Sequence, residues 1–264
     1  MRLSISNIGW VSEADEQVYK IMKKLDFQGL EIAPTRIFPE SPYDKSEDAK
    51  KWSESLKNEY GFCVPSMQSI WYGRQEKIFH SPEDREALTE YTKKAIDFAA
   101  AIGCGNLVFG CPRNRNIDGE YDPDVAIDFF RTIGDYAASR GTTIGMEANP
   151  PIYNTNFIND TISAIKLIEQ VGSDGFKLNV DLGTVIQNEE NLSELIGKVS
   201  VINHVHISEP GLKPIEERQL HSDLRDILAK EKYQGFVSIE MGKVDDIYLL
   251  EEKMKYVKEI FHDL

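Results

Sequence analysis

Four residues with metal-binding side chains follow short apolar segments in the second half of the chain. They are Glu147 in GMEANP, Asp181 in NVDLGT, His206 in HVHISE and Glu240 in FVSIEM. Each interval between them is about one strand–helix repeat, so the four would end successive strands of one parallel sheet. Because the C-terminal ends of parallel strands meet at one edge, we expect the four side chains to converge there.

Three carboxylates and one imidazole brought together need a counter-charge. Unpaired buried carboxylates are costly and repel one another, whereas a divalent cation bound between them removes both costs. Oxygen-rich ligand sets with one imidazole suit Mn²⁺, Mg²⁺, Co²⁺ or Zn²⁺. A single acid at a strand end serves equally well as a helix cap or in a surface ion pair. The prediction of one divalent metal ion therefore depends on all four residues being in register.

The elements that must position these residues alternate along the chain. Amphipathic helical segments, for example 16–25, 85–102, 125–139 and 247–261, lie between apolar segments that resemble strands. Ser81-Pro82 and Asp122-Pro123 each predict a helix start, because Pro at the first helical position often follows an N-cap residue. The strand-like segments occupy eight ranges: 3–9, 29–34, 62–68, 106–111, 142–147, 177–182, 203–208 and 236–241.

Eight βα units in 264 residues predict an α/β fold, a single (β/α)8 barrel that forms one domain over residues 1–264. The alternative is an open, doubly wound sheet. The sequence contains neither the Gly-x-Gly-x-x-Gly fingerprint nor a phosphate-binding P-loop, and this favours the barrel.

Composition narrows the range of partners. The formal net charge of −14 argues against nucleic acid and anionic membranes as partners, although local basic residues could still bind a small anion. No segment approaches the roughly 20 apolar residues of a membrane span, and the N-terminus resembles a strand rather than a signal peptide. Cys63, Cys104 and Cys111 lack metal-ligand spacing and predict a reducing, cytoplasmic location. The sequence leaves a homo-oligomer open.

The motifs also carry a family resemblance. With GLEI at 29–32, the four motifs around the candidate ligands resemble the xylose isomerase-like TIM barrel superfamily, which includes sugar phosphate isomerases and epimerases. Ketose 3-epimerases, inosose dehydratases, hydroxypyruvate isomerases and endonuclease IV-type enzymes are among its members. The resemblance covers nearly the whole chain and implies that the four residues are metal ligands. It also implies a sugar or polyol substrate, and a role for Glu147 and Glu240 in proton transfer.

Two positions depart from the ketose epimerase branch. That branch has a His where this chain has Thr184, and an Arg shortly after the His of strand 7, where this chain reads PGLK. Lys213 is the nearest cation that could substitute. We therefore predict a metal-dependent sugar, or sugar phosphate, isomerase or epimerase acting through an enediolate. A dehydratase or lyase and a non-catalytic sugar-binding barrel stay open, whereas five histidines are few for a multinuclear zinc nuclease.

Further residues after the predicted strands are candidates for substrate binding. Arginines in the loops bind carboxylate or phosphate, aromatic rings pack on sugar faces, and amides or acids bind hydroxyls. His204 shares the parity of His206 but lies one layer deeper, so we expect a hydrogen-bonded core residue there. His80, His221 and His262 are expected in loops or on the surface. The substrate-binding candidates are Trp10, Glu31, Arg36, Gln68, Trp71, Arg113, Glu209 and Lys213, with Arg115 a further possible anion ligand.

Overall fold

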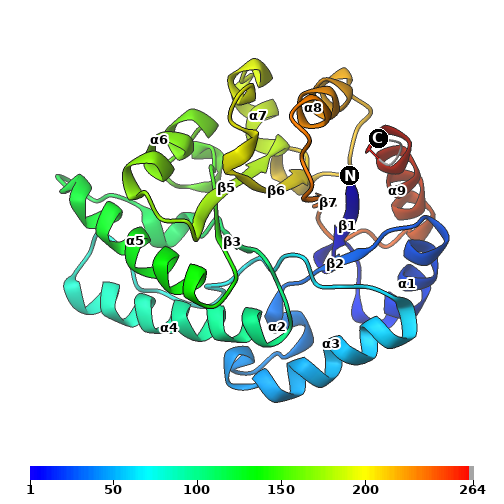
Figure 1. The fold of residues 1–264 in the computed structure, drawn as a ribbon, viewed down its shortest axis with the longest axis horizontal. Coiled ribbons are helices and arrows are strands. Elements are labelled where there is room, and N and C mark those ends of the chain that lie inside the picture. Colours follow the sequence, from blue (N-terminus) through cyan, green and yellow to red (C-terminus); the bar gives the residue numbers. More distant parts are fainter. Residues whose placement is uncertain (262–264) are drawn as a thin grey trace.

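The computed structural model describes residues 1–261 and contains a curled, parallel seven-stranded sheet. Its strand order is β2-β1-β7-β6-β5-β4-β3, so the first and last strands of the chain are neighbours. In Figure 1 the strands lie at the centre and the helices surround them. The strands are β1 (Arg2–Ser6), β2 (Gly29–Glu31), β3 (Leu107–Phe109), β4 (Ile144–Glu147), β5 (Phe176–Asp181), β6 (Ile202–Ile207) and β7 (Phe236–Ile239).

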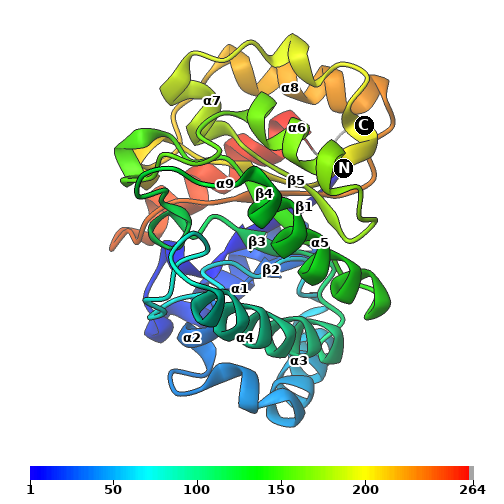
Figure 2. The same ribbon diagram turned by 90° about the vertical axis from the view of Figure 1, so that its left-hand side faces the viewer.

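The helices alternate with the strands along the chain, as the sequence predicts. Figure 2 shows α4, α5 and α3 side by side along one flank of the sheet. None of the helices in the described part of the chain is long and apolar enough to cross a membrane. The helices are α1 (Asp15–Lys24), α2 (Pro34–Ile37), α3 (Ser46–Tyr60), α4 (Pro82–Ala101), α5 (Pro123–Ser139), α6 (Thr161–Val171), α7 (Leu182–Asn188), α8 (Gln219–Lys230) and α9 (Ile247–Phe261).

The two predicted helix starts are confirmed. Ser81 caps α4 by accepting a hydrogen bond from the backbone N–H of Asp84, and Asp122 caps α5 in the same way. The buried face of α5 carries Phe129, Phe130 and Ile133, at the spacing of one helical stripe. Phe130 stacks on Phe176 of β5 with ring centroids 4.9 Å apart, which fixes the helix against the sheet.

The prediction of a continuous strand at 62–68 was wrong. This segment makes only isolated parallel bridges, to Gly29 and Ile32 on one side and to Leu107 on the other. The physical cause is Pro65, which has no N–H to donate and interrupts the ladder. The other seven predicted strands are present with somewhat different bounds.

The register of the central strands sets the heights of the candidate ligands. Asp181 on β5 pairs with His206 on β6, and His206 pairs with Ser238 on β7. Glu147 at the end of β4 pairs with Asn179, two residues before Asp181. Since side chains alternate between the two faces of a strand, these residues share the inner face while their neighbours pack under the helices.

Candidate metal centre

The structure brings the four candidate ligands together. One ligand atom from each of Glu147, Asp181, His206 and Glu240 can be chosen so that all four lie within 4.8 Å of one another. Nδ1 of His206 lies 3.1 Å from Oε2 of Glu147 and 3.2 Å from Oε2 of Glu240. All four residues are buried, with no side chain turned away from the cluster.

Neighbouring side chains fix the two carboxylates of β4 and β5. The Nδ2 groups of Asn149 and Asn179 donate to the two oxygens of Glu147 at 3.0 and 2.9 Å. Asp181 accepts the backbone N–H of Thr184 at 2.8 Å and so caps α7, while Ser208 donates to its other oxygen. Oδ2 accepts both the N–H and the hydroxyl of Thr184, whereas Oδ1 accepts Ser208 and keeps a lone pair for a metal, so capping and metal binding are compatible in Asp181.

The imidazole of His206 is held from its other side by Glu31. Nε2 of His206 lies 3.0 Å from Oε2 of Glu31, which is fully buried. A carboxylate that accepts the second ring N–H fixes the tautomer and leaves the other nitrogen for a metal. In this arrangement the nitrogen left for a metal is Nδ1, which faces Glu147 and Glu240 and lies 3.3 Å from Nδ2 of Asn179.

The second inner histidine, His204, is a core residue, as predicted. Its Nε2 also lies 3.0 Å from Oε2 of Glu31, but at an angle that makes no hydrogen bond. The predicted hydrogen bond is therefore missing at this atom. Burial lowers the pKa of His204, although Glu31 opposes this, so a neutral ring is favoured.

The electrostatics of the cluster indicate that a cation fits. Burial, with Glu147 and Asp181 adding repulsion and His206 opposing, raises the pKa of Glu240 to about 7. Burial and then Glu147 raise the pKa of Asp181. Burial disfavours a charged His206, but Glu31 and Glu240 outweigh it and raise the pKa of His206 well above its usual value. The negative charge of the three carboxylates thus exceeds the positive charge that His206 can provide. A bound divalent cation would supply the missing positive charge.

A cavity of about 170 Å³ opens above the candidate ligands, at the C-terminal ends of the strands. Gln68 and Glu209, two of the predicted substrate residues, line it. Arg218 holds Glu209 through two hydrogen bonds of 2.7 Å, one to each carboxylate oxygen. Among the described residues that line this cavity there is neither Lys nor Arg.

The two tryptophan candidates and Arg36 do not line this cavity. Trp10 donates its indole N–H to Asp15 at 2.7 Å, and Arg36 forms an ion pair with the same carboxylate at 2.6 Å. Trp71 is buried and donates to Thr92 at 2.8 Å. These side chains fix the loops after the strands instead of facing the cavity.

The remaining predicted residues are not brought to the cavity either. Glu31 lies beneath it, and Arg113 and Lys213 are exposed outside its lining. His80 is exposed, as expected. His221 was wrongly predicted, since it is fully buried in α8 with Nδ1 2.8 Å from the hydroxyl of Tyr256. His262 lies outside the described residues.

Several residues of the site were missed or misread at the level of the sequence. Arg115 is fully buried and donates to the carbonyl oxygen of Glu147 and to Oδ1 of Asn149, at 2.8 and 2.7 Å. Asn149 and Asn179 each lie two residues from a predicted ligand. Side chains two residues apart on a strand point to the same face, so this spacing could have identified both residues. Cys111 lines the cavity from a loop and Tyr153 from the end of a short 3-10 helix, and no sequence periodicity marks either residue.

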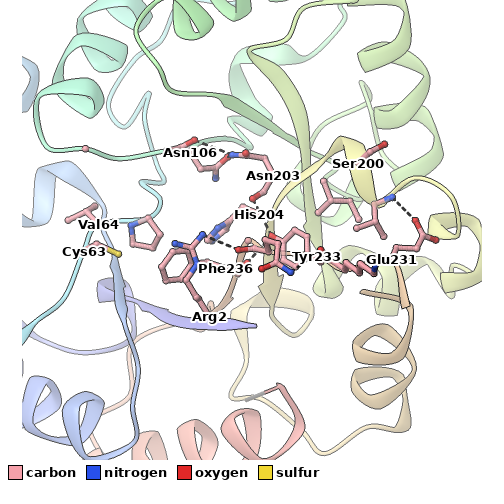
Figure 3. Close-up of a pocket in the computed structure, with 18 residues that line it drawn as sticks. Arg2, Cys63, Val64, Asn106, Ser200, Asn203, His204, Glu231, Tyr233 and Phe236 are labelled. Carbon is pink, nitrogen blue, oxygen red and sulfur yellow. Dashed lines mark hydrogen bonds between the residues drawn. The ribbon is translucent and has the colours of Figure 1, made fainter. Parts of the chain in front are cut away.

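A larger cavity, of about 750 Å³, lies at the opposite end of the sheet (Figure 3). Arg2, Asn203 and Phe236, which belong to the first residues of β1, β6 and β7, line it. In barrels of this kind the chemistry takes place at the C-terminal ends of the strands. Volume alone is therefore a poor guide, and the smaller cavity above Glu147 and Glu240 is the candidate site.

Comparison with known proteins agrees with this geometry. The family model described as xylose isomerase-like TIM barrel matches residues 19–260. The chain belongs to the xylose isomerase-like TIM barrel family. The four candidate metal ligands lie at or just beyond the ends of strands within the matched residues. A comparison with curated proteins found no match.

Solved structures share the fold across almost the whole chain. The 3-keto-D-glucoside 4-epimerase YcjR from E. coli superposes with a TM-score of 0.78 at 19% identity, covering 98% of this chain and 99% of the other. D-psicose 3-epimerase from Clostridium cellulolyticum H10 gives 0.78 at 15% identity, with the same coverage. An AP endonuclease of family 2 from Brucella melitensis gives 0.72 at 19% identity, covering 98% and 96%. At these identities the likeness establishes the fold alone.

Proposed function

We propose that this family member is a divalent-metal-dependent isomerase or epimerase of unphosphorylated sugars. The observation that carries the proposal is the convergence of Glu147 and Glu240 on Nδ1 of His206, at 3.1 and 3.2 Å, beneath a small cavity. Two carboxylates in such a site can remove and return a proton at carbon. The activities of the two epimerases of the same fold, YcjR and D-psicose 3-epimerase, support the reaction class.

The residues of the chain have separable tasks in this reaction. Glu147 and Glu240 exchange the proton on the carbon next to the sugar carbonyl, and Asp181 and His206 complete the ligand set. Asn149 and Asn179 hold Glu147 so that its oxygens face the cavity. A divalent cation bound by the four residues would supply Lewis-acid polarisation of the carbonyl and neutralise charge on the enediolate.

The lining supports an unphosphorylated substrate. Glu147, Asp181 and Glu240 line the cavity together with Glu209, whose charge is paired with Arg218, and the described lining residues include no Lys or Arg. A phosphate dianion would add two negative charges to a site whose ligands already exceed the charge of one divalent ion. The cavity is also below the roughly 300–1,000 Å³ of pockets for drug-sized ligands, and suits a single sugar.

The test is exchange of the α-proton in D₂O, followed by NMR, for a panel of ketoses with Mn²⁺ and with EDTA. We expect Mn²⁺-dependent exchange, at least tenfold lower kcat/KM for the phosphate ester of the best ketose, and loss of exchange in Glu147→Gln and Glu240→Gln. Inversion at the exchanging carbon identifies an epimerase, and transfer of the carbonyl an isomerase. Loss of water instead identifies the dehydratase alternative. Binding without exchange for any ketose would leave only a sugar-binding barrel.

We also propose that residues 62–68 act as the eighth strand of a closed, single-domain barrel. Hydrogen bonds on both sides support this, since Met67 accepts from the N–H of Val108 at 2.8 Å and Ile32 accepts from the N–H of Gln68 at 2.8 Å. Slow hydrogen exchange at the amides of Gln68 and Val108, comparable to that in β1, would support closure. Rapid exchange at both would favour an open sheet.

A further inference from the structure

Tyr153 reaches over the candidate metal centre from a loop that the proposed chemistry does not yet use. It ends a short 3-10 helix, Pro151–Tyr153, between β4 and α6, and it lines the cavity together with Glu147 and Glu240. Its hydroxyl accepts the backbone N–H of Gly211 at 2.9 Å. The ring therefore spans from the loop after β4 to the loop after β6.

The backbone around Gly211 is fixed from a third loop. Gly211 and Leu212 both have positive φ, 72° and 54°, and a left-handed conformation is uncommon for leucine. The carbonyl of Leu212 accepts the N–H of Gly242, after β7, at 2.8 Å. A side chain at Gly242 would place its Cβ 3.0 Å from that carbonyl oxygen, so the two loops meet closely. The direction of the Gly211 N–H towards Tyr153 is thus set by three loops.

This contact leaves the hydroxyl hydrogen of Tyr153 available. A phenol has one hydrogen to donate, and the N–H of Gly211 occupies only an acceptor position. Within residues 1–261 no acceptor for that hydrogen is found. The other hydroxyl groups that line the cavity are engaged, because Ser69 donates to Gln68 and Ser208 donates to Asp181.

The surroundings keep the group a donor. Burial, with Asp181 and Glu240 adding repulsion, raises the pKa of Tyr153, so the phenol stays neutral. The cavity is otherwise rich in carboxylate acceptors, which suit the hydroxyl hydrogens of a sugar but not its oxygens. A neutral hydroxyl donor beside the carboxylates can donate to a sugar oxygen. Such a hydrogen bond strengthens as negative charge develops on that oxygen during the reaction.

We infer that Tyr153 donates a hydrogen bond to one oxygen of the bound sugar and so positions the reacting carbon between Glu147 and Glu240. The inference rests on the proposed function and adds a substrate contact made from outside the metal ligand set. The loop at Gly211 and Leu212 holds the phenol in place for this contact.

The test compares Tyr153→Phe with Tyr256→Phe in the Mn²⁺-loaded protein. Tyr256 is the control, because its hydroxyl also accepts a backbone N–H, that of Arg218 at 2.9 Å, and contacts Nδ1 of His221 at 2.8 Å, but the residue does not line the cavity. With the ketose that exchanges best, we expect kcat/KM to fall tenfold to a hundredfold in Tyr153→Phe and less than threefold in Tyr256→Phe. Mn²⁺ affinity should stay within threefold of wild type in both.

A series of singly deoxygenated ketoses gives a second measurement, and its wild-type part does not depend on the folding of any variant. The wild type should discriminate at least tenfold against loss of one particular oxygen, and Tyr153→Phe should lose that discrimination. Equal kinetics of the two variants, or no discrimination by the wild type at any position, would overturn the inference while leaving the proposed function intact. Absence of exchange in the wild type itself would instead count against the proposed function.

Discussion

The most informative single change is Glu240→Gln in the absence of metal. The folded pKa of Glu240 is about 7, against an ordinary value of 4.5. A carboxyl whose pKa is raised by folding binds its proton more tightly in the folded state. Ionising it therefore costs stability, from about pH 4.5 upwards and in full above about pH 7. At 1.36 kcal/mol per unit, the full cost is about 3 kcal/mol.

Glutamine keeps the shape and cannot ionise, so we expect the variant to be more stable than wild type in EDTA at pH 8, by about 2–3 kcal/mol. With about 2.1 cal/mol/K per residue over 264 residues, this is a rise in Tm of about 5 °C. Mn²⁺ at about a hundred times its Kd should raise the wild-type stability by about 2.7 kcal/mol. The variant should gain much less, because it lacks one anionic ligand.

Urea unfolding at pH 8, with EDTA and with Mn²⁺, measures both effects. Glu252→Gln is the control, since Glu252 is exposed and pairs with Lys253 on the surface, and it should change stability by less than about 0.5 kcal/mol. If Glu240→Gln is less stable than wild type in EDTA and responds to Mn²⁺ as wild type does, the argument that crowded acids require a cation is refuted.

Three further changes probe the supports of the site. Arg115→Met strands two buried acceptors, the Glu147 carbonyl and Asn149 Oδ1, so urea unfolding should show a loss of about 2–4 kcal/mol, and calorimetry a weaker Mn²⁺ affinity. Thr184→Val removes the hydroxyl 2.8 Å from Asp181 Oδ2 and should weaken Mn²⁺ binding about tenfold; unchanged affinity would show that this bond does not orient the ligand. Burial lowers the pKa of His221 to about 4, so stability is lost as pH falls below about 6.5. Between pH 7 and pH 5 the wild type should lose about 2 kcal/mol more than His221→Gln, as measured by urea unfolding at both values.

The sequence predicted the parts of the structure that follow periodic rules. The alternation of strands and helices placed Glu147, Asp181 and His206 at strand ends, because apolar runs and caps are local signals. The segment at 62–68 also has an apolar run, yet Pro65 breaks its ladder. That effect depends on which amides meet neighbouring strands, which the run of residue types does not reveal.

Roles that depend on direction could not be predicted in the same way. Arg115 was considered as a possible anion ligand in a loop, and the structure has it fully buried beneath Glu147 and Asn149. Trp71 follows a strand, as a sugar-stacking ring would, but turns inward to donate to Thr92. Side chains in irregular loops take their direction from tertiary contacts, and no spacing rule encodes them.

The interior beneath the site shows why its chemistry and its stability compete. The buried oxygens of Ser4 and Ser238 and Nε2 of His204 have no hydrogen-bond partner within the described residues. Packed leucine or valine at these inner positions would be more stable, because unpaired buried polar groups are costly. The curled sheet instead keeps polar residues on its inner face, where Glu31 can hold His206 in one tautomer. Stabilising substitutions at Ser4 or Ser238 are therefore expected to be available, and their cost would appear as weaker metal binding through a displaced Glu31.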